Sequence, residues 1–390
     1  MKTSRHYKKI IHIIFTRCLG GAERSAINTI QALLQQSLDV TFLVIFDQRY
    51  TTSHSKQLLI KNLHANKIPH YILSTNHRFS LSTLKQILLL AQDADIIHSH
   101  GDRSDMYIFF IKLIKIFLKK TPHPLRIVTT QHGHANGNLR SRINQTIGHF
   151  LKFMFDTVIV VSGELKKNNP LYKYNSKCMV IPNFTPMLTL TTSPIKVKET
   201  FFHKHKIIAK GRIIGWLGRM EMVKGPKVFL SALENYNGNE ELTILIAGDG
   251  SLLKKLKYEQ KTMHFSPKIY LHFLGEIDDV AAFFAILDLF VMSSYLEGTP
   301  MVLLEAIASE VPFIAPNIGG IPSMLPASNN NNNFLFPVGN SKALASLLWS
   351  ILLKSKEELL AITKNNKSVL QEKYSMQSIL KELMEVAYEK

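Results

Sequence analysis

Short apolar runs alternate with longer helical patterns along most of this chain, and this alternation limits the fold more than any other feature. In the N-terminal half it predicts strands at 9–15, 39–46, 95–98, 126–131 and 157–161, separated by helices at 22–36, 80–92, 104–119 and 140–154. Such alternation is typical of βαβ units, whose strands lie parallel in one sheet. The N-terminal half is therefore predicted to be a parallel α/β domain.

A break in this rhythm divides the chain. Residues 185–206 contain two prolines, several Thr and a cluster of Lys and His, which predicts a linker. The alternation then restarts, with strands at 212–217, 242–247, 269–273, 288–292 and 313–315, helices at 225–236, 251–261, 278–286 and from Pro300, and a helical stretch over 341–389. A length of 390 residues allows two or three domains, and the repeated pattern indicates two.

We therefore expect two Rossmann-like parallel-sheet domains that face a cleft. The N-terminal domain is predicted over 1–190, the linker over 191–206 and the C-terminal domain over 207–372. Ligands of open parallel α/β domains bind outside the carboxyl ends of the strands, so the chemistry is expected there.

The positive charge of the chain is concentrated in one half. The whole chain has a formal charge of +18, and residues 1–190 contain 25 Lys and Arg against 9 Asp and Glu, a net +16. Such an excess indicates an anionic partner, of which nucleic acid, anionic lipid and a phosphorylated substrate are the usual classes. Two distant cysteines, Cys18 and Cys178, exclude a Cys-rich zinc site and a disulfide framework and favour a reducing compartment.

No apolar stretch predicts a signal peptide or a membrane span. The run that ends at Phe15 is interrupted by His12 and is better interpreted as a buried first strand. The stretch from Met106 to Leu118 contains two lysines and is too short to span a bilayer. It predicts a basic, strongly apolar helix, which is either a domain helix with snorkelling lysines or a surface that lies on anionic lipid.

The segment EGTPMVLLE at 297–305 is the most informative motif. Thr299 is predicted to cap a helix and Pro300 to occupy its first turn. The backbone amides and dipole at such a terminus favour a phosphate. Glu297 and Glu305 flank the terminus, and carboxylates accept hydrogen bonds from sugar or ribose hydroxyls.

Two further segments follow predicted strands of the same domain. GRMEMVKG at 218–225 offers Arg219 as a planar fork and Lys224 as a point charge for phosphate oxygens. AGDGS at 247–251, with Gly250, has glycines that allow close backbone approach, but it does not meet the dinucleotide fingerprint. Each of these signals is weak alone.

The N-terminal half has its own candidates. Gly20 and Gly21 join the first strand to the first helix, where the backbone could approach a phosphate. His132 follows a strand end, so its side chain could face the cleft.

Metal binding is not predicted from the remaining patterns. The pairs His98/His100 and His132/His134 lack a third ligand at a clear spacing. The Asp-Ala-Asp at 93–95 precedes a strand, so a helix-to-strand junction explains it better than a metal motif. The Asn run at 329–333 is interpreted as a low-complexity loop without chemistry.

Taken in order and spacing, these motifs resemble the GT-B glycosyltransferases, and specifically the retaining family 4 group, over nearly the whole chain. The resemblance rests on GGAE at 20–23, TQH at 130–132, Val161-Ser162, IPN at 181–183, Gly218-Arg219 with Lys224-Gly225, GDG at 248–250, the Glu297/Glu305 pair and GGIP at 319–322.

The resemblance implies a UDP- or GDP-linked sugar donor held mainly by the C-terminal domain, with no other cofactor and no metal. It assigns His132 and Glu297 to catalysis or sugar positioning. It assigns donor binding to Gly20, Gly21, Arg219, Lys224, Gly250, Gly298, Thr299, Met301, Val302 and Glu305. The final helix, within 373–390, resembles the segment that packs back on the first domain.

The resemblance also implies a mechanism and a partner. The incoming hydroxyl attacks from the face that the leaving phosphate vacates, so no protein nucleophile is required. The acceptor, a glycan or a lipid-linked molecule, would lie mostly on the basic N-terminal domain, and cell-surface polysaccharide or lipopolysaccharide synthesis is implied. Ser323 and Asn333 depart from the residues usual in the family, which leaves the donor identity open.

Two alternatives stay open. An inverting GT-B transferase or a nucleotide-sugar epimerase would need a different base, for which Glu23, Asp102 or His132 could serve. A non-catalytic module that binds anionic lipid or nucleic acid would also explain the charge, although no nucleic-acid motif is present. We expect a cytoplasmic protein, peripheral on the inner face of the membrane, that does not bind nucleic acid.

Overall fold

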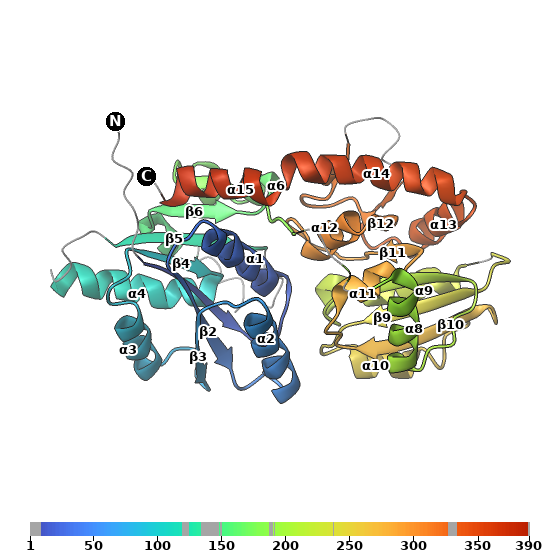
Figure 1. The fold of residues 1–390 in the computed structure, drawn as a ribbon, viewed down its shortest axis with the longest axis horizontal. Coiled ribbons are helices and arrows are strands. Elements are labelled where there is room, and N and C mark those ends of the chain that lie inside the picture. Colours follow the sequence, from blue (N-terminus) through green and yellow to red (C-terminus); the bar gives the residue numbers. More distant parts are fainter. Residues whose placement is uncertain are drawn as a thin grey trace. The chain divides into compact units, whose positions relative to one another are not determined.

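The structure is a computed structural model, and it describes residues 9–118, 125–133, 148, 150–186, 190, 192–236, 238–326 and 334–388. The chain forms two compact units (Figure 1). Unit 1 comprises Met1–Phe184 and Met376–Lys390, and unit 2 comprises Thr185–Ser375. Both are α/β structures with one parallel sheet each, as the alternating pattern predicts.

Unit 1 is built on a seven-stranded parallel sheet in the order β3-β2-β1-β4-β5-β6-β7. Its strands are β1 (Ile10–Thr16), β2 (Val40–Asp47), β3 (His70–Thr75), β4 (Ile96–His100), β5 (Arg126–Gln131), β6 (Thr157–Val160) and β7 (Cys178–Val180). Both faces of the sheet are covered, so the central strands are apolar nearly throughout. Alternate side chains of β1 accordingly enter two different cores, Ile10 and Ile14 one and Ile11 and Ile13 the other.

The helices of unit 1 pack on the two faces of this sheet. They are α1 (Gly21–Gln35), α2 (Ser53–Ala65), α3 (Leu81–Leu90), α4 (Asp102–Leu118), the 3₁₀ turn η1 (Lys152–Met154), α6 (Gly163–Asn168), α7 (Pro170–Lys173), α15 (Met376–Leu383) and the π-helical turn η5 (Met384–Tyr388). Helices α1, α2 and α15 contribute to one core, and α3 and α4 contribute to the other.

Unit 2 contains a six-stranded parallel sheet in the order β10-β9-β8-β11-β12-β13. Its strands are β8 (Arg212–Leu217), β9 (Leu242–Ala247), β10 (Ile269–Gly275), β11 (Leu289–Val291), β12 (Phe313–Pro316) and β13 (Leu335–Phe336). The order reverses between β8 and β11, and in doubly wound sheets ligands bind at such a switch point.

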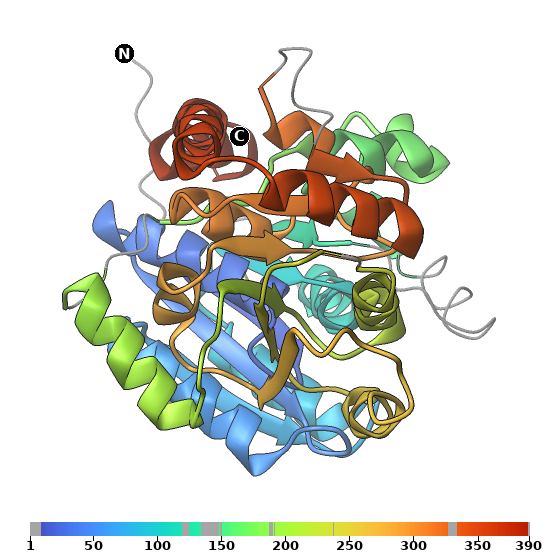
Figure 2. The ribbon, with the colours of Figure 1, turned by 90° about the vertical axis from the view of Figure 1, so that its right-hand side faces the viewer.

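The helices of unit 2 also cover both faces of their sheet (Figure 2). They are α8 (Pro194–His205), η2 (Met222–Lys224), α9 (Pro226–Glu234), α10 (Leu253–Glu259), α11 (Val280–Ala285), α12 (Met301–Ala308), η3 (Pro322–Met324), α13 (Ser341–Leu352) and α14 (Lys356–Lys373). Helices α8, α11 and α12 share one core, and α9, α10 and α13 share the other.

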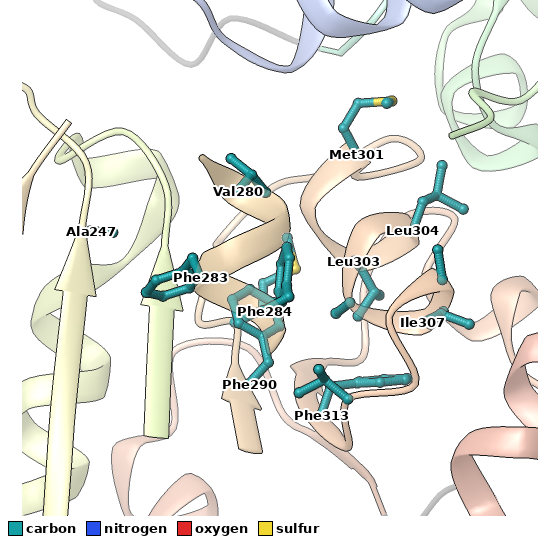
Figure 3. Packing of buried hydrophobic residues seen from close by; sticks show 14 of the residues in the cluster. Ala247, Val280, Phe283, Phe284, Phe290, Met301, Leu303, Leu304, Ile307 and Phe313 are labelled. Carbon is teal, nitrogen blue, oxygen red and sulfur yellow. The ribbon is translucent and has the colours of Figure 1, made fainter. Parts of the chain in front are cut away.

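The core behind α12 holds that helix in place. Figure 3 shows the rings of Phe283 and Phe284 on α11 beside β11, and Leu303 and Ile307 of α12 above Phe313. Phe283, Phe284 and Leu303 are completely buried. Burying such side chains stabilises the fold by roughly 1.5–3 kcal/mol each, which fixes the position of the residues that precede α12.

The C-terminal helical stretch is shared by the two units. Helices α13 and α14 pack on unit 2, whereas α15 and η5 lie on unit 1, where α15 contacts α1. Ile379, Leu383 and Tyr388 are buried in the core beside α1 and β1. The chain therefore returns to the first unit after Ser375.

The linker prediction for 191–206 differs from the structure, because Pro194–His205 forms helix α8. Ser193 caps this helix through the backbone amide of Lys196, Pro194 occupies its first turn, and Val197 and Phe201 enter the core of unit 2. Pro194 thus marks the start of an amphipathic helix, and His203, Lys204 and His205 lie in its last turn.

Other expected elements have separate outcomes. Most of the helix expected over 140–154 and the Asn run at 329–333 lie outside the described residues. The first apolar run is the buried strand β1, as predicted. Among the described residues, none of the helices combines the length and apolar character needed to cross a bilayer.

Candidate active site

Backbone hydrogen bonds join the loops at the carboxyl ends of β8 and β9. The amide of Gly218 donates to the carbonyl oxygen of Ala247 over 3.1 Å. The amide of Met220 donates to the backbone carbonyl oxygen of Asp249 over 2.9 Å. Gly248 has a φ of +125°, and a Cβ there would lie 1.9 Å from the oxygen of Gly218. Glycine is therefore required for the two loops to approach so closely.

Gly225 makes the equivalent contact between the β8 loop and the loop after β11. It adopts a φ of +60°, and a Cβ on it would lie 2.0 Å from the carbonyl oxygen of Ser293. The hydroxyl of Ser293 donates to the carbonyl of Gly225 over 2.8 Å and accepts from the indole of buried Trp216 over 2.9 Å. Pro226 then begins α9. These contacts fix the position of the preceding residue, Lys224.

Lys224 and Glu297, two residues assigned to the site from separate motifs, form an ion pair. The Lys224 Nζ donates to the Glu297 Oε1 over 2.7 Å, and the two side chains are 24% and 7% exposed. One residue ends η2 and the other lies in the loop after β11, so the pair connects the neighbouring strands β8 and β11. Glu297 is not an exposed surface carboxylate.

Helix α12 begins one residue later than predicted. Pro300 is the cap residue and Met301 the first helical residue, so Thr299 does not cap the helix. Proline has no side-chain acceptor, and the cap is made without a side-chain hydrogen bond. Met301 and Val302 lie in the first turn, where the amides have no partner within a helix. Their N–H groups suit an anion.

The turn at 319–320 packs against the loop that precedes α12 and supports this helix terminus. The amide of Gly320 donates to the carbonyl of Gly298 over 2.8 Å. Gly319 has a φ of +58°, and a Cβ there would lie 2.1 Å from the carbonyl oxygen of Glu297. Ser323 donates its hydroxyl to Gly320 over 2.7 Å, so the residue that departs from the family pattern stabilises the turn.

The remaining predicted residues of unit 2 differ in exposure. Glu305 is buried at 5% exposure in α12, whereas Arg219 is exposed on the loop after β8. Gly250 adopts a φ of +154°, and a Cβ there would lie 2.7 Å from the carbonyl oxygen of Met220. Glu221 accepts hydrogen bonds from the amide and hydroxyl of Ser251, at 3.2 and 2.8 Å. The β8 and β9 loops are thus also joined by side chains.

In unit 1, Gly20 and Gly21 lie at the carboxyl end of β1. Gly20 is the cap of α1, and its amide donates to Glu23 Oε2 over 2.9 Å. The other oxygen of Glu23 accepts from the hydroxyl of Thr16 over 2.6 Å. Glu23, considered as a base for an inverting reaction, is therefore occupied in holding the glycine turn.

His132 follows β5 and is partly exposed. Its Nε2 lies 3.0 Å from His100 Nδ1, and the two rings stack at 5.3 Å between centroids. Burial lowers the pKa of His132 to about 4, although the side chain of Asn183 acts in the opposite direction. His132 is consequently neutral at pH 7 and is suited to hydrogen bonding rather than to providing charge.

A third histidine, which the sequence patterns did not indicate, completes a cluster with the pair on β4. His12 on β1 lies opposite His98 in the sheet, and candidate ligand atoms of His12, His98 and His100 lie within 4.8 Å of one another. All three are buried, and burial lowers the pKa of each. A metal would have to displace the hydrogen bonds that these rings make.

Beside the histidines lies a buried lysine that the sequence did not single out. Lys152 is fully buried, and its Nζ lies 2.6 Å from Asp102 Oδ1 and 3.2 Å from Asp105 Oδ2. It also donates to Gln131 Oε1 over 2.7 Å, and Gln131 in turn donates to the carbonyl of Gly133 over 2.6 Å. The lysine thereby braces the backbone on both sides of His132. Asp102, another candidate base, is engaged in this ion pair.

Comparison with known families agrees with the architecture. Residues 197–369 match the model of glycosyl transferases group 1, and residues 19–186 match the model of glycosyltransferase family 4. The first match contains all six strands of the unit 2 sheet, and the second contains β2 to β7 of the unit 1 sheet.

Two curated relatives are similar over most of their length. GalNAc-α-(1→4)-GalNAc-α-(1→3)-diNAcBac-PP-undecaprenol α-1,4-N-acetyl-D-galactosaminyltransferase of Campylobacter jejuni is 23% identical over 350 residues, 88% of this chain and 89% of the relative. UDP-Gal:α-D-GlcNAc-diphosphoundecaprenol α-1,3-galactosyltransferase of Escherichia coli is 24% identical over 381 residues, 94% of this chain and 92% of the relative.

Solved structures share the fold. Anabaena HepE in complex with UDP-glucose is 18% identical, with a TM-score of 0.76 over 97% of this chain and 98% of that one. A glycosyltransferase from Rickettsia africae is 21% identical, with a TM-score of 0.70 over 98% of each chain. The chain is therefore a glycosyltransferase of the GT-B fold and belongs to the family described by the group 1 and family 4 models.

Proposed function

We propose that this enzyme transfers a sugar from a nucleotide-diphosphate-sugar to a lipid-linked glycan, with retention of the anomeric configuration. The observation that carries the donor part of the proposal is the Lys224–Glu297 pair next to the N-terminus of α12. A cation, a carboxylate and unpaired helix amides gather there at the switch point of the unit 2 sheet.

These groups match the two parts of such a donor. Lys224 and the first-turn amides of α12 provide positive charge for the diphosphate, whose negative charge grows as the sugar leaves. Glu297 and Glu305 provide acceptors for sugar and ribose hydroxyls. Arg219, exposed on the same loop as Lys224, is free to turn toward phosphate oxygens.

Retention is the part of the proposal that rests on the family resemblance. The acceptor hydroxyl would attack from the face that the phosphate leaves, and the phosphate oxygen would accept its proton. His132, neutral at pH 7, would position the sugar. NMR of the anomeric proton in the product tests this step. Inverted product would favour an inverting transferase, and an altered sugar without transfer would favour an epimerase.

The acceptor class is supported by two observations. The two relatives above carry acceptor names that contain diphosphoundecaprenol or PP-undecaprenol. The N-terminal half, with a net +16, offers the charge that a lipid-linked diphosphate requires. A role in cell-surface polysaccharide or lipopolysaccharide synthesis, at the cytoplasmic face of the membrane, follows from this acceptor class.

Unit 1 also has an exposed apolar group that suits a lipid surface. Phe150, Phe153 and Met154 are 69%, 40% and 41% exposed, and the two phenylalanine rings lie 6.0 Å apart. Lys112 of α4 donates to the carbonyl of Met154, and Lys177 donates to that of Phe153 over 3.4 Å. Aromatic side chains flanked by lysines are typical of proteins that rest on anionic bilayers.

A screen of nucleotide sugars by thermal unfolding is the first experiment, because a ligand that binds only the folded state raises the unfolding temperature. UDP-sugars and GDP-sugars are compared with the free nucleotides. A donor that stabilises wild type but not Lys224→Ala or Glu297→Ala supports the site. If both variants fold and transfer sugar as fast as wild type does, the site assignment is wrong.

Membrane binding is tested with vesicles of neutral and anionic lipid at several salt concentrations. We expect the double variant Phe150→Ser/Phe153→Ser to bind anionic vesicles several-fold more weakly than wild type. Tyr258→Ser, which removes a ring that is 71% exposed on unit 2, is the matched control. An oligonucleotide in place of vesicles tests the nucleic-acid alternative, which strong specific binding without donor binding would favour.

A further inference from the structure

A group of arginines lies at the carboxyl edge of the unit 1 sheet. Arg17 directly follows β1, Arg49 follows β2, and Arg103 lies in the first turn of α4, after β4. These three strands are neighbours in the sheet, and the strand order reverses between β1 and β4. Ligands of doubly wound sheets bind at such a switch point, outside the carboxyl ends of the strands.

One aromatic ring brings two of these guanidinium groups together. The guanidinium carbon of Arg17 lies 4.2 Å from the centroid of the Tyr50 ring, and that of Arg49 lies 5.2 Å from the same centroid. The negative face of an aromatic ring attracts a guanidinium group. Tyr50 is 58% exposed, so its ring serves these contacts at the surface rather than the packing of the core.

A single carboxylate joins Arg49 to Arg103. Arg49 donates from Nε and Nη2 to the two oxygens of Asp47, over 2.9 and 2.8 Å. Arg103 donates from Nη1 to Asp47 Oδ2 over 2.6 Å. The side chain of Asp47 is 3% exposed, whereas those of Arg49 and Arg103 are 38% and 20% exposed. The carboxylate is therefore buried behind two guanidinium groups that stay open to solvent.

The positive charge of this group exceeds what its own ion pairs neutralise. Arg103 is bound to Asp47 and also donates to two backbone carbonyls. Arg49 uses Nε and Nη2 for Asp47, which leaves the N–H groups of Nη1. Within the part of the chain that the structure describes, exposed Arg17 stacks on a ring but makes no ion pair. One carboxylate thus faces three arginines, and two positive charges remain.

The chemistry of the remaining groups suits a diphosphate. The planar N–H fork of an arginine matches the oxygens of a phosphate in bidentate geometry. Each phosphate of a diphosphate diester has one negative charge, so two adjoining phosphates match the two positive charges that remain. The residues assigned to the donor phosphates, Arg219 and Lys224, belong to unit 2, so this site on unit 1 suits a different diphosphate.

We propose that these side chains form a binding site for the diphosphate of a lipid-linked acceptor. Arg17 and Arg49 bind the phosphate oxygens. Tyr50 and Arg103 are positioning residues, which act through the stacked guanidinium groups and through Asp47. That the diphosphate belongs to an acceptor rests on the proposed function, whereas the affinity of the site for a diphosphate does not.

The test measures the binding of geranyl diphosphate to the full chain by isothermal titration. This soluble compound has a short prenyl chain on a diphosphate. We expect binding that weakens as the salt concentration rises, and we expect inorganic pyrophosphate, but not geraniol, to compete. Failure of wild type to bind the probe, or competition by geraniol alone, would overturn the proposal.

Arg17→Gln should weaken the binding of geranyl diphosphate about tenfold, because a charged hydrogen-bond donor is lost. Lys67→Gln is the matched control. It removes the same charge from an exposed residue that precedes β3, at the opposite edge of the same sheet, and it should bind the probe as wild type does. Unchanged affinity in Arg17→Gln, or equal weakening in both variants, would overturn the site.

Substitutions of Tyr50 test the positioning of the arginines. Tyr50→Ser should weaken binding several-fold, because the ring that orients both guanidinium groups is lost. Tyr50→Phe keeps the ring and should bind the probe as wild type does. Equal weakening in Tyr50→Phe and Tyr50→Ser, or wild-type affinity in Tyr50→Ser, would overturn the role of the ring.

Competition with nucleotides identifies which diphosphate the site takes. We expect UDP and GDP to leave geranyl diphosphate bound, and Arg17→Gln to keep the rise in unfolding temperature that the donor causes. Displacement by a nucleotide, together with loss of donor binding in Arg17→Gln, would assign the arginines to the donor and overturn the proposal. Wild type that binds the probe as expected but transfers no sugar to a lipid-linked acceptor would instead contradict the proposed function alone.

Discussion

The Lys224 ammonium lies 2.7 Å from the Glu297 carboxylate, and the carboxylate is the more buried partner, at 7% exposure against 24%. The two residues come from neighbouring strands and are held by glycine turns whose backbones touch. Each therefore neutralises the charge of the other. A diphosphate would offer Lys224 a second anion, while Glu297 would keep a free oxygen for a hydroxyl.

Lys224→Ala should weaken the binding of the nucleotide-sugar at least tenfold, about 1.4 kcal/mol at 25 °C. The loss follows from the missing charge next to the phosphates and from the unpaired carboxylate that remains. The measurement is the donor-induced rise in unfolding temperature, followed by a titration. Lys227→Ala, at the start of α9 and 65% exposed, is the matched control and should bind donor as wild type does. Equal loss in both variants would mean that overall charge, rather than the site, holds the donor.

Lys152→Met should destabilise unit 1 by about 3–5 kcal/mol, because it leaves the fully buried Asp105 without its cation. Burial raises the pKa of the Asp105 carboxyl, and the neighbouring charge of Lys152 opposes that rise. Chemical denaturation followed by a signal from unit 1 measures the change. Lys167→Met, on an exposed face of α6, should have little effect.

A second substitution separates charge from packing at Lys152. Adding Asp105→Asn to Lys152→Met should restore part of the lost stability, since no buried charge then remains without a partner. The comparison needs the loss of stability that Asp105→Asn causes by itself. If the double variant is less stable than Lys152→Met by that same amount, the two residues do not interact through charge and the lysine acts through packing alone.

Much of both sheets was predictable, because short apolar runs mark the buried strands of a parallel sheet locally. The strands β1, β2, β4 to β6 and β8 to β12 lie close to the predicted runs. The stretch 47–79, which forms α2 and β3, was missed, and β3 is an edge strand with only part of its surface buried. Helix α8 was taken for a linker because two buried side chains, Val197 and Phe201, are a weak signal within a polar segment.

The site was less predictable where it depends on contacts between distant strands. The Glu297 and Lys224 motifs are local, so the sequence indicated both, but nothing in either motif reports their ion pair. His12 was seen only as an interruption of an apolar run. Its partnership with His98 arises because β1 and β4 are neighbours with those residues in register. Lys152 does not belong to any motif that the sequence analysis used. Its role depends on contacts between η1, α4 and β5, which are distant in the sequence.

Gly225→Ala should disrupt the donor site of unit 2 and lower its stability by at least about 2 kcal/mol. A φ of +60° costs an L-residue roughly 1–2 kcal/mol, and the new Cβ would also lie 2.0 Å from the Ser293 oxygen. Thermal unfolding with and without donor is the measurement. Gly163→Ala, whose Cβ would enter open space, is the control and should leave both stability and donor binding close to wild type. A stable Gly225→Ala variant with normal donor affinity would contradict the close contact.

Asp47 should give unit 1 a stability component that disappears in acid. Hydrogen bonds and charge from Arg49, with charge from Arg103, lower the pKa of its carboxyl to about 2. Because the folded pKa is below the unfolded value near 4, the carboxylate is worth up to about 2 kcal/mol above pH 4, and this contribution is lost as the pH falls through 2. The difference in unfolding free energy between wild type and Asp47→Asn, measured by urea denaturation, should therefore shrink between pH 5 and pH 2. For exposed Asp39→Asn the difference should stay near zero throughout. A gap for Asp47→Asn that is independent of pH would mean that geometry, rather than charge, makes this aspartate stabilising.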